Sequence, residues 1–193
     1  MLTNGWDQGS RKEAARVFQF DSAEFEARHV HLSDELDCGR LSLDMYLDQV
    51  LFGEPRPFTK EAFKSFMYAQ SQPCSDVLQV VKEVAQAERY LVAALNNESL
   101  ELNRYRIERF QLGGYCDLFL SSCYLGVRKP DEKMYRLAFQ LTQRAPDECL
   151  LIDDREKNLE PAQRMGMRTI HYQDPRQLRQ ELRRYGVIEG SHD

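Results

Sequence analysis

The sequence predicts an α/β fold in which a parallel sheet carries a helical insertion, and three observations lead to this prediction. Residues 8–88 have apolar side chains at helical spacing, whereas residues 89–193 alternate short apolar runs with helical segments. Strands that alternate with helices of about 10–15 residues form βαβ units, which make a parallel sheet. The third observation is the run 149–154, in which four mostly apolar residues are followed by two carboxylates. This run is typical of a strand that is buried on both faces and whose carboxyl end opens into a site.

The helical insertion, residues 8–88, contains a start signal for each expected helix. An acidic residue follows three positions after the first two starts, which is the spacing of a capping box. The segment Glu-Pro-Arg-Pro at 54–57 interrupts the helical pattern before the fourth start. We expect helices to begin at Ser10, at Asp21, at Ser42, at Thr59 and within Pro73–Ser75, the last one ending near Ala87.

The α/β unit, residues 89–193, contains four apolar runs of strand length. Gly166 and Gly186 are suited to helix ends, because glycine adopts without strain the left-handed conformation that ends many helices. We expect strands over 90–95, 118–121, 150–152 and 168–172, and helices over 99–110, 131–143, 156–165 and from Asp174-Pro175 to Gly186.

The composition argues against several classes of protein. A formal charge of −5 disfavours a nucleic-acid-binding protein, since contacts to phosphates need a basic face. No apolar stretch approaches the roughly 18 residues of a membrane-spanning helix, and the first residues lack the basic and apolar regions of a signal peptide. The five cysteines are odd in number and form no Cys-x-x-Cys pair, so we expect reduced thiols in a cytoplasmic protein.

Polar side chains follow three of the expected strands. Asn96 and Asn97 follow the first strand, Asp153 and Asp154 end the third, and Lys129 lies on the loop after the second. The proline that follows Lys129 keeps this lysine out of the helical conformation. Because the carboxyl ends of parallel strands meet at one sheet edge, we expect these groups to lie together. Carboxylates, an ammonium group and amides suit a phosphate group bound together with Mg²⁺.

Each of these features also has a structural interpretation. The carboxylates at 153–154 can cap the helix that follows them. Lys129 can be a solvated surface lysine, and the asparagines can be turn residues, because asparagine hydrogen-bonds its own backbone in turns. The occurrence of all three features in this order, at three strand ends, favours a site.

With these motifs the chain resembles the haloacid dehalogenase-like (HAD) hydrolase superfamily, in the branch with a helical cap that includes the phosphatase-like N-terminal domains of epoxide hydrolases. The resemblance implies a Rossmann-like core with a parallel sheet, formed by residues 89–193, and a helical cap formed by residues 8–88. The second motif departs from the family pattern, because Asn96 stands where Thr or Ser is usual. The matching segments are 95–99, 126–130 and 151–162 for the second, third and fourth motifs, and 166–171 for the strand that follows.

The resemblance implies a phosphoryl transfer in two steps. An aspartate attacks phosphorus, a second aspartate two residues later acts as acid and base, and Mg²⁺ neutralises charge. By match, Asp154 would bind the metal directly, and Asp153 would be a second ligand or would orient the site. Asn158 would support these two carboxylates.

The resemblance also implies how phosphate is held. Lys129 would bridge the nucleophile and the phosphate group, and Asn96 with the amide of Asn97 would hold phosphate oxygens. The substrate would be a small phosphorylated metabolite selected by the cap. We expect neither nucleic acid nor a membrane as a partner.

The first family motif, which carries both catalytic aspartates at the end of the first strand, is not found in this chain. Residues 1–7 resemble the segment after that motif, and Asp7 follows Gly and Trp rather than a strand, so we do not assign it as the nucleophile. In the family, this first strand is central and lies between the strands that here end at Asn96 and Asp153. We therefore expect a chain that begins late and leaves a central sheet position unfilled, where another chain could pair.

Three functions stay open from the sequence. The first is a Mg²⁺-dependent phosphatase in full-length form, of which this chain is a truncated and impaired version. The second is a non-catalytic relative that keeps the site as a binding or interaction surface. The absent nucleophile supports this second function, and the retained Lys129, Asp153 and Asp154 oppose it. The third is a 2-haloacid dehalogenase, which uses the same nucleophile without Mg²⁺ and has less need of paired aspartates.

Overall fold

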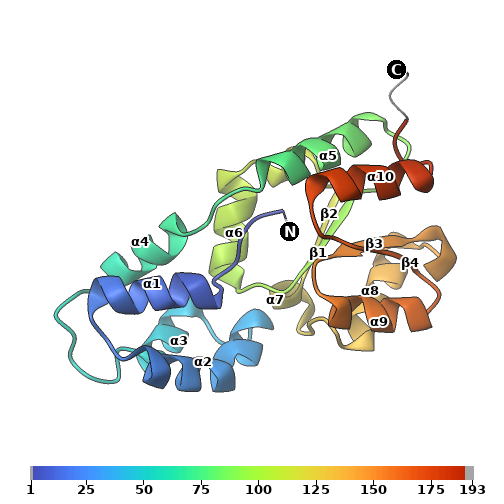
Figure 1. Cartoon of the computed structure of the whole chain (residues 1–193). Coiled ribbons are helices and arrows are strands. Elements are labelled where there is room, and N and C mark those ends of the chain that lie inside the picture. The colour runs from blue at the N-terminus through green and yellow to red at the C-terminus, as the bar shows by residue number, and fades with distance from the viewer. Residues whose placement is uncertain (1, 190–193) are drawn as a thin grey trace.

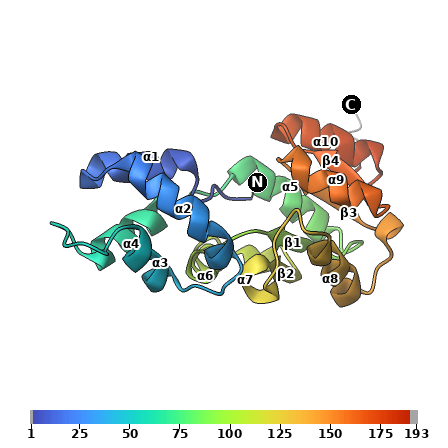
Figure 2. The same ribbon diagram turned by 90° about the horizontal axis from the view of Figure 1, so that it is seen from below.

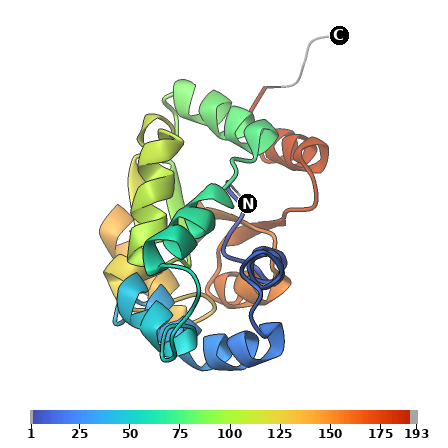
Figure 3. The ribbon, with the colours of Figure 1, turned by 90° about the vertical axis from the view of Figure 1, so that its left-hand side faces the viewer.

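The computed structural model of the protein describes residues 2–189, which form two lobes (Figure 1). The helical lobe is drawn in blue to blue-green, and the sheet lobe holds four short strands with helices around them. Seen from below, the helical lobe extends to one side of the strands (Figure 2). The view onto the end of the helical lobe shows the green and the red helix lying next to each other (Figure 3).

The elements follow the predicted order. The helical lobe contains α1 (Gln8–Phe18), α2 (Ser22–Asp37), α3 (Leu43–Val50) and α4 (Lys60–Ala69). The sheet lobe contains the strands β1 (Ala93–Asn96), β2 (Leu118–Ser121), β3 (Leu150–Asp153) and β4 (Arg168–His171). Its helices are α5 (Ser75–Gln86), α6 (Leu100–Arg109), α7 (Ser122–Leu125), α8 (Glu132–Thr142), α9 (Glu156–Arg164) and α10 (Pro175–Arg184), with 3₁₀ turns at Leu112–Gly114 and Pro146–Glu148.

Side-chain caps set most of the helix starts in the helical lobe. Asp21, Ser42 and Thr59 each accept a hydrogen bond from the backbone N–H three residues on, as predicted. The prediction of Ser10 as the first cap is wrong, because Asp7 takes that role and accepts from the Ser10 N–H at 2.8 Å. A carboxylate is at least as good a cap as a hydroxyl, so the helix begins one turn earlier.

The four strands pair in parallel, as predicted, and they do so in two pairs. β1 pairs with β2, with Asn96 opposite Ser121, and β3 pairs with β4, with Asp153 opposite His171. Among residues 2–189, the ladder of β1 includes only β2, and that of β3 includes only β4. The carboxyl ends of β1 and β3 nevertheless meet, since the Lys129 ammonium donates to the Leu95 carbonyl and to Asp153.

β3 packs against other elements on both faces, because its side chains alternate between two cores. Leu150 and Ile152 pack into a cluster with α5 and α10, whereas Leu151 packs with Tyr135 of α8 and Leu159 of α9. This alternation follows from the two-residue period of a strand. Helices on both faces of a parallel sheet are the expected doubly wound arrangement.

The helical lobe has an aromatic core of its own. Phe63 of α4 is fully buried, and rings from α1, α2 and the segments between helices surround it. α5, although it lies within the predicted cap residues 8–88, packs on α10, where Glu83 and Arg179 form an ion pair. We therefore propose that the helical lobe ends before α5. No helix among residues 2–189 is long and apolar enough to cross a membrane.

A cavity of about 1160 Å³, here called the central cavity, lies between the two strand pairs. Its walls include β1 and β3, together with residues 2–8 at the start of the described chain. Residues from the helical lobe, among them His29 and Asp37, line it as well. The cavity therefore reaches from the strand ends to the helical lobe.

Candidate functional site

Lys129 lies at the centre of the predicted site. Its ammonium group donates to Asp153 Oδ2 at 2.5 Å and to the Leu95 carbonyl at 2.6 Å. The lysine is only 8% exposed although it lies on a loop. A buried ammonium needs a partner of opposite charge, and Asp153 supplies it. The contact joins three segments that the sequence predicts at one sheet edge: the ends of β1 and β3 and the loop after β2.

Asp153 is held on both carboxylate oxygens. Its Oδ1 accepts from the Arg155 N–H and from Asn158 Nδ2, each at 2.9 Å, while Oδ2 accepts from Lys129. Burial raises the pKa of the Asp153 carboxyl, but the Lys129 ammonium and these hydrogen bonds outweigh burial and leave that pKa below its ordinary value. Asp153 is therefore a fixed anion. Asn158 lies beside it, and its supporting role stays a prediction.

The side chain of Asn97 holds the backbone of Lys129. Asn97 Nδ2 donates to the Lys129 carbonyl, and Asn97 Oδ1 accepts from the Lys129 N–H, both at 2.8 Å. Because the side chain makes both bonds, it is committed to Lys129. The prediction that Asn97 binds phosphate therefore rests on its backbone amide.

Asn96 belongs to a network beneath the strand ends. Its Nδ2 donates to Asn103 Oδ1 at 2.9 Å, and its Oδ1 accepts from Ser121 Oγ at 2.7 Å. Asn103 and Ser121 are buried, and the sequence analysis did not identify them. The β1–β2 register that brings Ser121 opposite Asn96 is a tertiary feature, so no local pattern could have shown it. The phosphate-binding role of Asn96 stays a prediction, and it would need this side chain to exchange partners.

Asp154 is exposed and lines the central cavity. Among residues 2–189, no group of three or more His, Cys, Asp or Glu side chains is placed to hold a metal ion. Mg²⁺ in phosphate-binding sites commonly has one or two carboxylate ligands and takes its others from water and the substrate phosphate. Asp154 fits that mode of binding. Asp153, with both oxygens engaged, fits the orienting role that was the alternative for it.

The rest of the central cavity carries a buried ion pair and more basic than acidic side chains. Arg106 pairs with Glu98, and Arg106 Nε donates to Ser71 Oγ at 3.0 Å, with all three residues buried. Sequence reasoning missed this pair, since a single Arg in a helix has no distinguishing pattern. The basic residues that line the cavity are Arg11, Arg89, Arg106, Arg128, Lys129, Arg144, Arg155 and Arg168. The acidic residues that line it are Asp7, Asp37, Glu98, Glu148, Asp153 and Asp154, so the lining has a small excess of positive charge, which suits an anionic ligand.

Comparison with known proteins assigns the family. The profile of the haloacid dehalogenase-like hydrolases matches residues 4–166. The chain belongs to this family. A solved HAD family enzyme from Bacteroides thetaiotaomicron, in complex with magnesium and inorganic phosphate, has the same fold, with a TM-score of 0.75 at 17% identity over 89% of each chain.

Two curated relatives extend the comparison. Bifunctional epoxide hydrolase 2 of Rattus norvegicus is 33% identical over 72 residues, which cover 37% of this chain and 13% of that protein. Flavin mononucleotide hydrolase 1 of Arabidopsis thaliana is 25% identical over 162 residues, or 84% of this chain and 65% of that protein. The HAD-like chain thus corresponds to only a small part of the epoxide hydrolases.

Proposed function

We propose that the site binds the phosphate group of a small phosphorylated metabolite and serves Mg²⁺-dependent hydrolysis of the phosphate ester. The observation that carries the proposal is the buried Lys129–Asp153 pair at the strand ends, next to the central cavity. A buried ion pair contributes little net stability compared with apolar packing. A phosphate-binding role gives a reason for the presence of this buried pair. The names of the Arabidopsis relative and of the magnesium and phosphate complex support phosphate chemistry.

In the proposed reaction, Lys129 binds both the phosphate and the nucleophile. Asp153 keeps the ammonium group of Lys129 oriented. Asn97 fixes the lysine backbone, so that the ammonium has little freedom to move away. A metal ion held by Asp154, the substrate phosphate and water would neutralise charge that develops during transfer. Fixed charge of this kind stabilises the transition state because it needs no reorganisation during the reaction.

The described residues supply no nucleophile of the family type. Asp153 is the only carboxylate among residues 2–189 that forms an ion pair with Lys129, and Asp7 is engaged as the cap of α1. We propose that an aspartate-bearing strand between β1 and β3 completes the active enzyme. The chain of 193 residues would then bind phosphate without turnover.

Two alternatives make different predictions. A non-catalytic binding protein is favoured by the same lack of a nucleophile, and it would stay inactive after such a strand is added. A 2-haloacid dehalogenase would not need Mg²⁺, and the fixed Asp153 with Asp154 beside it speaks against this chemistry.

The free state of all five cysteines supports a reducing, cytoplasmic location.

Phosphate binding by the chain tests the proposal. We expect ³¹P NMR titration with inorganic phosphate to show saturable binding that Mg²⁺ strengthens, and Lys129→Met to abolish it. Lys133→Met is the matched control, because Lys133 is an exposed lysine on the helix that follows the site. Equal binding by the wild type and Lys129→Met, with or without Mg²⁺, would contradict the proposal.

A further inference from the structure

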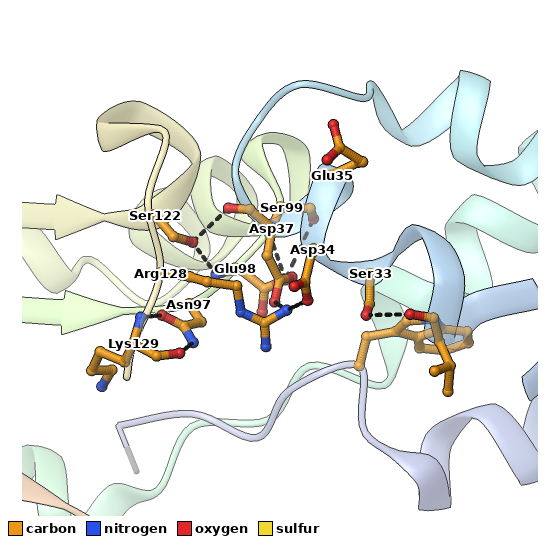
Figure 4. Close-up of polar contacts among 12 residues, drawn as sticks. Ser33, Asp34, Glu35, Asp37, Asn97, Glu98, Ser99, Ser122, Arg128 and Lys129 are labelled. Atoms are coloured by element: carbon orange, nitrogen blue, oxygen red, sulfur yellow. Dashed lines mark hydrogen bonds and ion pairs between the residues drawn. The ribbon is translucent and has the colours of Figure 1, made fainter. Parts of the chain in front are cut away.

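The C-terminal end of α2 lies against the segment 122–128, which leads directly into Lys129 (Figure 4). Ser122 Oγ donates to the Asp37 carbonyl at 2.5 Å, and Arg40 Nη1 donates to the Gly126 carbonyl at 3.1 Å. The helical lobe thus contacts the loop of the site through both backbone and side chains.

A close approach of two backbones gives this contact a defined geometry. Gly39, just after α2, has φ +69°, and a Cβ atom built at this position would lie 2.3 Å from the Cys123 carbonyl oxygen. Only glycine fits both the conformation and the space. The end of α2 therefore lies as close to α7 as the main chain permits. A shift of one of these helices would displace the other.

Arg128 extends the contact to the residue before Lys129. Its guanidinium pairs with Asp34 and, at 3.3 Å, with Asp37, both on α2. The Asp34 side chain is 71% exposed and that of Asp37 is 22% exposed. Exposed pairs are weakened by solvent, and Asp37 is the better shielded of the two partners. The two acids hold Arg128 from the lobe that does not contain the site.

The same loop is fixed from the β1 side. Ser122 Oγ accepts from the Glu98 N–H at 3.0 Å, and Asn97 holds the backbone of Lys129. Segment 122–129 is therefore held between α2 and the residues that follow β1. Loss of the α2 side would leave the lysine supported only from the strand ends, by Asn97, the Leu95 carbonyl and Asp153 among the described residues.

We propose that Arg128 is a positioning residue that couples the placement of the helical lobe to that of the Lys129 ammonium. The inference rests on the proposed function in one respect, that Lys129 holds phosphate. Its consequence is that the site binds phosphate well only while α2 is in place.

The decisive experiment compares removal of Arg128 with removal of its partners. We expect Arg128→Gln to weaken the binding of inorganic phosphate about fivefold or more. We expect the double variant Asp34→Asn, Asp37→Asn to weaken it as well, although this variant keeps the positive charge. If Arg128 instead contacted phosphate directly, release from its acids would leave binding unchanged or make it tighter. That result would overturn the proposal.

A matched control and a conservative variant complete the design. Arg136→Gln removes an arginine of a similar pair, with Glu132 at 3.3 Å on the exposed face of α8, and is expected to bind phosphate as the wild type does. Arg128→Lys keeps the charge but not the forked geometry, so it should restore binding in part.

Hydrogen exchange keeps the inference testable if the chain binds no phosphate. The Lys129 N–H, which donates to Asn97, should exchange faster in Arg128→Gln and in the Asp34, Asp37 double variant than in the wild type. Unchanged exchange in both would refute the coupling. Absent phosphate binding with faster exchange would refute the proposed function and leave the coupling supported.

Discussion

At the scale of single residues, the site is a set of charges that the fold holds in fixed places. Lys129 and Asp153 are buried together, and their partners Asn97 and Asn158 are committed to them. Removal of one member of a buried pair leaves an uncompensated charge, which costs about 3–5 kcal/mol. Substitutions here will therefore affect stability as well as function, so that folding must be checked beside any activity measurement.

Asp37 makes stability depend on pH. Burial raises the pKa of its carboxyl from the ordinary 3.8 to about 7, against the attraction of Arg128 and Arg155 and with the repulsion of Glu98 and Asp34. The folded state therefore binds a proton that the unfolded state releases above pH 4. Stability should fall as the pH rises from about 4 to about 7 and then level off.

Asp37→Asn should remove this dependence and raise the free energy of unfolding above pH 7 relative to the wild type. Urea unfolding at pH 5 and pH 8 measures the effect. If the free energy of unfolding of the wild type instead increased from pH 5 to pH 8 relative to that of Asp37→Asn, the raised pKa of Asp37 would be contradicted.

At the scale of elements, the aromatic core makes the helical lobe a cooperative unit. Phe63 of α4 contacts the rings of Trp6, Phe18 and Phe58, with centroid distances of 6.1, 5.1 and 6.2 Å. Phe63→Ala should lower the free energy of unfolding by about 3–5 kcal/mol, because the surrounding rings cannot close the space it leaves. Thermal unfolding measures the loss. Met45→Ala on the exposed side of α3 is the control and should change stability little.

At the scale of the whole molecule, the central cavity separates two strand pairs that would otherwise share one sheet. β1 and β3 both line it, and among the described residues neither has a second strand partner. The buried edge of a strand has N–H and C=O groups that need partners. A strand that entered this cavity would add core side chains and ladder hydrogen bonds together.

An N-terminal extension that adds an apolar strand ending in Asp-x-Asp should therefore have two effects. It should stabilise the protein by several kcal/mol, on the order of 5–10, since three or four apolar side chains become buried. It should also give Mg²⁺-dependent turnover of p-nitrophenyl phosphate, which we expect to be undetectable for residues 1–193.

The matched control carries Asn in place of the first added Asp and should keep the added stability while losing turnover. Stabilisation without turnover in the Asp form would favour the non-catalytic alternative. Activity of the 193-residue chain that Asp7→Asn abolished would assign Asp7 as the nucleophile and refute the proposal that a further strand supplies it.

The sequence by itself determined the order of the elements, the parallel strands and the meeting of Lys129 with Asp153. These features depend on local periodicity, on capping residues and on the rule that parallel strands end at one edge. Only the tertiary structure decided that the side chains of Asn96 and Asn97 hydrogen-bond to Ser121, Asn103 and Lys129. It also decided that α2 holds Arg128. Such contacts join residues far apart in the chain, and their geometry depends on how helices and strands pack, which no short segment specifies.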